Sequence, residues 1–79
     1  MQVLLFGITK EIINQDVLII PTSENIKDVG ELKAYLKQKY PDLSRLSSLG
    51  VAVNSVYAKE DVLIGSSDEL ALIPPVSGG

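Results

Sequence analysis

The residues with the most distinctive chemistry are the last two, Gly78 and Gly79, which follow two prolines, a valine and a serine. A terminal glycine leaves its carboxylate with no side chain beside it, and paired glycines let the backbone pass a constriction that would exclude a Cβ atom. The two prolines stiffen the approach to this end, because proline fixes φ and restricts the residue before it. The pattern predicts a projecting tail, residues 74–79, that enters another protein and places its carboxylate in that protein's active site.

Composition excludes several kinds of chemistry in the chain itself. The 79 residues include no cysteine and no histidine. Disulfides, Fe–S clusters and thiolate metal sites are therefore excluded, and the commonest general base and metal ligand is absent. We expect no bound metal or cofactor and no catalysis by this chain alone.

Charge and hydropathy narrow the choice of partner and location. The net charge of −3 argues against nucleic acid, whose phosphates require Lys and Arg, and suits a basic protein surface instead. No apolar run approaches the roughly 20 residues of a membrane span, and the N-terminus lacks the layout of a signal peptide. We therefore expect a cytoplasmic protein without a membrane partner.

The elements that must position the tail follow one another in a simple order. A hydrophobic fraction of 46% indicates a globular chain, and its length indicates a single domain, residues 1–79. Apolar, β-branched runs predict strands, and one amphipathic stretch predicts a helix. Strands are expected at 2–6, 16–20, 50–54, 56–58 and 70–73, and a helix at 28–40.

The remaining segments are predicted to connect these elements. Residues 9–14 are interpreted as a helical turn or a loose connection, residues 42–49 as a loop, and residues 66–69 as a turn. One helix across one face of a mixed sheet of four to five strands is the economical packing, which defines an α+β fold. If the first and last strands are central neighbours, they run parallel and the tail leaves beside the middle of the sheet.

The helix has a clear start signal and a clear apolar face. Asp28 is a predicted N-cap, and Glu31 three residues later completes a capping-box pattern. The predicted buried face carries Val29, Leu32, Leu36 and Tyr40.

This order of elements resembles the β-grasp, or ubiquitin-like, fold, and the residues resemble the small, sulfur-carrier subunits of molybdopterin synthase. The resemblance runs nearly end to end, and its specific part is an acidic turn, an apolar strand and a Pro-Pro-Val-Ser-Gly-Gly ending. The matching segments are Val3-Leu4-Leu5-Phe6 with Lys10-Glu11, Leu32 with Tyr35 and Leu36, Val51-Ala52-Val53-Asn54, and residues 68–79. Ser67 and the aliphatic pair at 72–73 depart from common family residues, and neither departure touches the tail.

The resemblance implies a mechanism centred on the last residue. An adenylating partner, similar to ubiquitin-activating enzymes, would use ATP to join the Gly79 carboxylate to AMP. Sulfur from a persulfide donor would displace AMP and leave a thiocarboxylate. The tail would then enter the large, catalytic synthase subunit and give sulfur to the pterin precursor, in a 2:2 heterotetramer. Without cysteine, the chain can carry sulfur only on a carboxylate.

Partner contacts are predicted along the tail and at its base. Phe6 is expected to belong to the core first and to an interface second. Leu72 and Ile73 are expected to supply apolar contacts from the sheet face near the tail. The full predicted set is Gly79 as the reacting residue, with Gly78, Ser77, Val76, Pro75, Pro74, Ile73, Leu72 and Phe6 as contacts.

Three alternatives remain open. Carriers of the thiamine pathway also end in Gly-Gly but are typically shorter and lack Pro-Pro-Val-Ser. A ubiquitin-like modifier would use Gly79 to form isopeptide bonds with lysines of target proteins. A small interaction domain with no tail chemistry would be indifferent to removal of Gly78 and Gly79.

Overall fold

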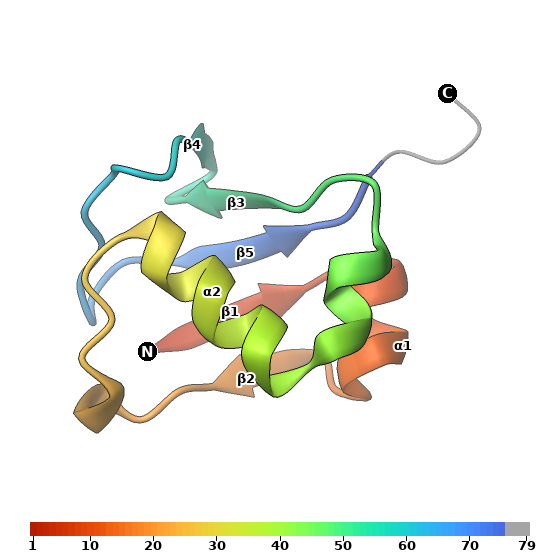
Figure 1. The fold of residues 1–79 in the computed structure, drawn as a ribbon. Helices are drawn as coiled ribbons and strands as arrows, with labels where there is room; N and C mark the ends of the chain where they lie inside the picture. The colour runs from red at the N-terminus through yellow and green to blue at the C-terminus, as the bar shows by residue number, and fades with distance from the viewer. Residues whose placement is uncertain (76–79) are drawn as a thin grey trace.

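The computed structural model describes residues 1–75, and the elements follow the predicted order (Figure 1). Five strands and two α-helices are joined by two short 3₁₀ helices. The bounds are β1 Gln2–Leu5, α1 Ile8–Ile13, β2 Val17–Ile19, η1 Thr22–Glu24, α2 Val29–Lys39, η2 Pro41–Arg45, β3 Gly50–Val53, β4 Val56–Ala58 and β5 Leu70–Ile73.

The sheet has the order β2-β1-β5-β3-β4, so the last strand lies in the middle. β5 pairs in parallel with β1, with Leu5 opposite Leu72, and antiparallel with β3, with Gly50 opposite Ile73. The outer pairs, β1 with β2 and β3 with β4, are antiparallel. The mixed sheet, its single main helix and the parallel pairing of the first and last strands are confirmed.

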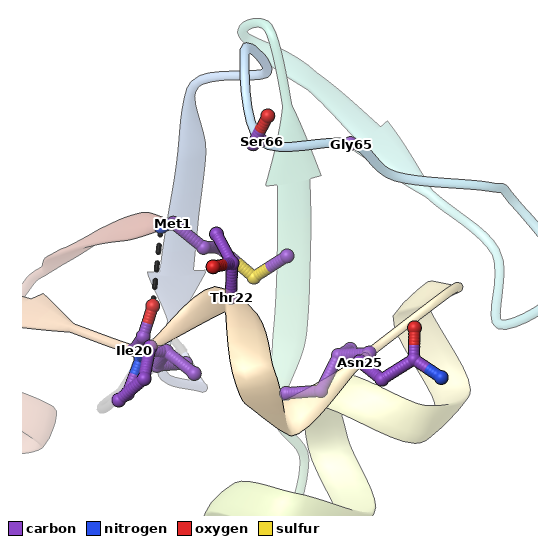
Figure 2. A pocket seen from close by; sticks show the side chains of 8 residues that line it. Met1, Ile20, Thr22, Asn25, Gly65 and Ser66 are labelled. Carbon is purple, nitrogen blue, oxygen red and sulfur yellow. Dashed lines mark hydrogen bonds between the residues drawn. The ribbon is translucent and has the colours of Figure 1, made fainter.

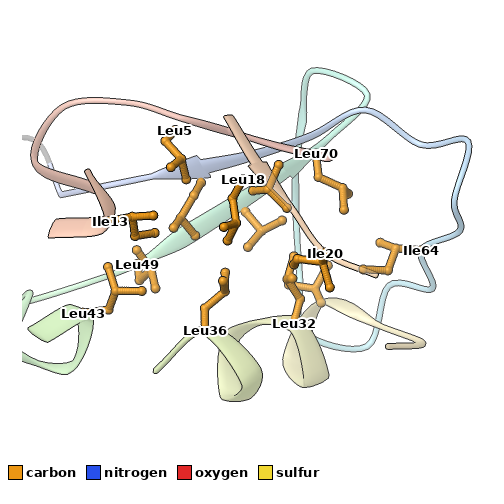
Figure 3. Packing of buried hydrophobic residues seen from close by; sticks show 14 residues of the cluster. Leu5, Ile13, Leu18, Ile20, Leu32, Leu36, Leu43, Leu49, Ile64 and Leu70 are labelled. Carbon is orange, nitrogen blue, oxygen red and sulfur yellow. The ribbon is translucent and has the colours of Figure 1, made fainter. Parts of the chain in front are cut away.

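The hydrophobic core lies between the sheet and α2 (Figures 1 and 3). Alternate strand residues face it, as the period of two along a strand requires: Val3 and Leu5 in β1, and Leu70 and Leu72 in β5. The helix contributes its buried side chains, which are Val29, Leu32 and Leu36. Leu18, Ile20, Leu43, Leu49, Val51, Ile13 and Ile64 complete the cluster.

The predicted cap of α2 is confirmed. The Asp28 carboxylate accepts a hydrogen bond from the Glu31 backbone N–H at 2.8 Å. The Glu31 carboxylate in turn accepts from the Lys27 backbone N–H at 2.9 Å, one residue before the cap. Two N–H groups that the helix itself leaves without a partner are thereby satisfied.

One connecting segment takes one of its two predicted forms, and another differs from its prediction. For residues 9–14 the helical alternative is confirmed, because they lie mostly in a short α-helix, α1, which ends at Asn14 in the left-handed region. Residues 42–49 were predicted as a loop, but their first part belongs to η2, where Pro41 occupies the first turn and Leu43 is fully buried. The serines of this segment obscured its leucines, of which Leu43 and Leu49 are buried. Proline at a first helical position is pre-organised for a helical turn.

Candidate functional site

The base of the predicted tail lies where β5 ends, beside the middle of the sheet. β5 ends at Ile73, and Pro74 and Pro75 follow it; all three are half-buried. The chain leaves between the end of β1 and the start of β3, because β5 pairs with both strands. The predicted tail residues Val76, Ser77, Gly78 and Gly79 lie outside the described residues.

Gly7 closes one side of this base. Its backbone has φ 54° and ψ −133°, a conformation that side chains rarely adopt and that glycine reaches without strain. An added Cβ atom at this position would lie 3.1 Å from Cγ of Pro74. The proline ring therefore packs directly against the bare backbone of the turn between β1 and α1.

Thr9 holds that turn in place from within. Its side chain is fully buried, and its hydroxyl accepts a hydrogen bond from the Phe6 backbone N–H at 3.0 Å. The same hydroxyl donates to the Phe6 carbonyl oxygen, which also accepts from the Thr9 backbone N–H. Both backbone polar groups of Phe6 are thus satisfied by one residue of α1, and Gly7 lies inside the closed turn.

Gly50 lies on the opposite side of the base. It is paired with Ile73, and an added Cβ atom would lie 3.2 Å from Cε1 of Tyr57 and 3.8 Å from Cβ of Ile73. The Tyr57 ring therefore packs over Gly50 while most of its surface, 71%, remains exposed. Glycine on each side lets the neighbouring chains approach the strand end closely.

The predicted apolar contacts divide by the faces of their strands. Ile73 faces outward and is half-buried. Leu72 faces the core and has no exposed surface, so its side chain is not available as a direct contact, and we leave it out of the proposed contact surface. Phe6 is 46% exposed, so the expectation that it belongs to the core was wrong. Buried Val3 and Leu5 already mark the inward positions of β1, and their alternation places residue 6 on the other face.

Three residues at the base were missed by sequence reasoning. Gly7 was given no role, although a glycine between a strand and a helix signals a positive φ. Thr9 was treated as part of a connection, and only the buried side of α1 identifies it. Tyr57 was given no role, because its position beside β3, the strand that pairs with β5, follows only from the sheet order.

The acidic pair at the other end of β5 builds a turn, as interpreted from the sequence. The Asp68 carboxylate accepts hydrogen bonds from the side-chain amide of Asn54 at 3.0 Å and from the backbone N–H of Gly65 at 2.8 Å. These two donors, the Asn54 amide first, hold the pKa of the Asp68 carboxyl below its usual value. The Asn54 amide oxygen accepts from the Glu69 backbone N–H at 2.9 Å. These bonds connect the β3–β4 hairpin to the start of β5.

A pocket of about 200 Å³ also lies away from the tail (Figure 2). Gly65 and Ser66, which precede β5, line one side of it, whereas the tail follows the far end of that strand. The Met1 amine beside it donates to the Ile20 carbonyl oxygen at 3.1 Å. In the part of the chain that the structure describes, no group of side chains is arranged to hold a metal ion. Among residues 1–75, every helix is too short or too polar to cross a bilayer.

A mixed five-stranded sheet with one main helix on one face, and with the C-terminal segment leaving from its central strand, defines a β-grasp protein of the ubiquitin-like class. Residues 3–79 match the ThiS family. The chain therefore belongs to the ThiS family.

Three similar proteins place the chain more finely. It is 38% identical to the molybdopterin synthase sulfur carrier subunit of Dictyostelium discoideum, covering 99% of this chain and 94% of that relative. Among solved structures, SAMP1 of Haloferax volcanii has a TM-score of 0.77 and 28% identity, covering 99% and 97%. The complex of subunits 1 and 2 of molybdopterin-converting factor from Helicobacter pylori contains a chain with a TM-score of 0.63 and 26% identity, covering 99% and 96%.

Proposed function

We propose that this chain is the sulfur-carrier subunit of molybdopterin synthase and that Gly79 is the residue that carries the sulfur. The observation behind the proposal is the position of β5. This central strand leads directly into Pro74 and the Gly-Gly ending, in a chain whose relative from Dictyostelium carries the same functional name. The sheet is a rigid base, and the reactive group belongs to the segment that follows it.

The proposed reaction cycle takes place inside two partners. An adenylating enzyme transfers AMP from ATP to the Gly79 carboxylate and releases pyrophosphate. The outer sulfur of a persulfide donor displaces AMP and forms an acyl disulfide. A thiol then cleaves its S–S bond, so that the chain keeps a thiocarboxylate and the donor sulfur leaves in a disulfide with that thiol. The large synthase subunit then accepts the tail, and the sulfur passes to the pterin precursor. The complex of subunits 1 and 2 from Helicobacter pylori supports pairing with a large subunit. We propose a 2:2 heterotetramer that works in the cytoplasm.

In this scheme the chain is a donor and the partners are the catalysts. It has no histidine, and its tail residues 74–79 carry no basic side chain. Proton transfer during loading and unloading is therefore assigned to residues of the partners. The contribution of this chain is to present a backbone narrow enough to enter a channel, with a base that partners recognise through Phe6, Ile73 and Pro74.

Intact mass spectrometry tests the proposal. The chain is incubated with a molybdopterin-pathway adenylating enzyme, ATP and a persulfide donor. We expect the mass increase of one sulfur replacing one oxygen, and we expect it to disappear when ATP is omitted. A variant extended by one alanine after Gly79 is the matched control, because it keeps the fold and buries the reacting carbon inside a peptide bond. A sulfur-containing product from the extended variant would contradict the proposal.

A second candidate function is covalent modification of other proteins. The similarity to the Haloferax small archaeal modifier protein 1 favours it, because that protein is named as a modifier and shares the fold at 28% identity. In this case the activated Gly79 would form an isopeptide bond with a lysine amine. Conjugates that survive reducing agent on a denaturing gel, and that vanish with the extended variant, would identify this activity.

A further inference from the structure

The turn between β1 and α1 is placed to act on the tail although it is distant from it in sequence. In the parallel pair, Leu5 lies opposite Leu72. Continuing that register by two residues brings Gly7 beside Pro74. This agrees with the short distance, 3.1 Å, from Cγ of Pro74 to the place that a Cβ atom would occupy at Gly7. The first residue beyond β5 therefore packs against this turn before the chain continues.

Several hydrogen bonds hold the turn between β1 and α1 in place. The buried Thr9 hydroxyl satisfies both backbone groups of Phe6, and the Lys10 backbone N–H donates to the Gly7 carbonyl oxygen at 3.1 Å. Removing this buried hydroxyl is costly, because the Phe6 backbone N–H would lose its acceptor and the Phe6 carbonyl oxygen would keep only the bond from the Thr9 backbone N–H. A backbone conformation open mainly to glycine persists where its surroundings determine it in this way.

We propose that this turn is a guide for the tail, in which Gly7 seats Pro74 and thereby sets the direction in which the chain leaves the sheet. Gly7 and Thr9 are positioning residues and take no part in the chemistry. The inference rests on the proposed function, because direction matters only if the chain end must reach a partner's active site.

A small change in the direction of the chain at Pro74 can correspond to a large displacement of the chain end. Five residues follow Pro74, and an extended chain of that length reaches at most about 18 Å. Over that maximum reach, a rotation of about 10° at the base corresponds to a displacement of at most about 3 Å. A displacement of about 1 Å at a reacting centre can cost about 100-fold in rate. A side chain at position 7 would push on the ring at its closest point.

The test is the rate of thiocarboxylate formation in Gly7→Ala. We expect kcat/KM for loading to fall at least about tenfold, with the loss in kcat rather than KM, because the base still binds while the end is misplaced. The control is Asn25→Ala, which also puts alanine at a positive φ, 55°, but at the pocket lined by Gly65 and Ser66 before β5. It is expected to load at the wild-type rate, after both variants are shown to be folded by circular dichroism.

A double variant identifies the contact itself. Pro74→Ala removes the ring atom that a side chain at Gly7 would meet. If the loss in Gly7→Ala acts through that atom, adding Gly7→Ala to the Pro74→Ala chain costs much less than tenfold. A full tenfold loss in both backgrounds would overturn the inference, as would a wild-type rate in folded Gly7→Ala.

Thr9 gives an independent route if Gly7→Ala does not fold. Thr9→Ser keeps the hydroxyl and is expected to load nearly as well as wild type. Thr9→Val keeps the volume but removes both hydrogen bonds, and its kcat is expected to fall at least about tenfold. Equal rates in these two variants would refute the guide. The proposed function fails separately, because in that case the wild-type chain itself acquires no sulfur.

Discussion

Two neighbouring residues of β5 are expected to affect different properties of the protein when each is replaced by alanine, one its stability and the other its binding to a partner. Leu72 is fully buried in the central strand, and Ile73 is half-buried at the strand end beside the tail. Leu72→Ala removes core contacts and is expected to cost about 2–5 kcal/mol of unfolding free energy. A domain of this size is stable by about 4–12 kcal/mol, so the loss is a large fraction of the total. Ile73→Ala is expected to cost about 1 kcal/mol.

Urea denaturation followed by circular dichroism measures the first half of this prediction. With a slope of about 1–2 kcal/mol per molar urea, Leu72→Ala is expected to lower the midpoint by at least about 1 M. Calorimetric titration with the large synthase subunit measures the second half. Ile73→Ala is expected to weaken binding about tenfold, as for the minority of interface residues whose truncation costs more than about 1 kcal/mol. When binding is compared at the same concentration of folded protein, Leu72→Ala is expected to bind the large subunit as tightly as wild type.

Leu72 is expected to serve stability and Ile73 to serve recognition, so reversed results would refute this division. If the urea midpoint of Ile73→Ala were as low as that of Leu72→Ala, the outward-facing Ile73 would contribute as much to folding stability as a core residue. Normal binding by Ile73→Ala would remove it from the proposed contact surface.

Two further predictions concern hydrogen bonds away from the tail. Asp28→Ala is expected to cost about 1 kcal/mol in urea denaturation, because the Glu31 N–H at the start of α2 loses its acceptor, and Asp28→Ser is expected to recover most of this loss. The pKa of Asp68 is lower in the folded state, so its hydrogen bonds stabilise the fold above about pH 4 and this contribution is lost as pH falls through the folded-state pKa. Asp68→Asn is expected to reduce the urea midpoint at pH 7 and to flatten its decline below pH 4; an unchanged acid decline would assign that decline to other carboxyl groups.

Local signals in the sequence were sufficient for most of the fold. Asp28 and Glu31 mark the start of α2, and the apolar spacing after them predicts its buried side. The apolar runs predicted all five strands to within a residue or two of their ends. The segment after Tyr40 was predicted as a loop because serines and charged residues dominate it. Its leucines recur at every third position, which is the period of a 3₁₀ helix, and two of them, Leu43 and Leu49, are buried.

The contacts at the base of the tail were harder to predict from the sequence, because they depend on which strands are neighbours in the sheet. Gly7 and Pro74 are far apart in the sequence, and their contact follows only from the parallel pairing of β1 with β5. Leu72 and Phe6 were both assigned to the wrong side of the sheet, although alternation along their own strands carries that information. A strand's apolar content indicates burial in general, whereas the phase of the alternation decides which residue is buried.

The central place of β5 also governs when this protein can fold during its synthesis. β5 is the last strand of the sheet to be synthesised and lies between two strands made earlier, so those strands have no partner to join them until nearly the whole chain has left the ribosome. A chain that ends before β5 therefore cannot form the five-stranded sheet. The topology therefore makes completion of the sheet depend on translation of β5, the strand that precedes the proposed tail.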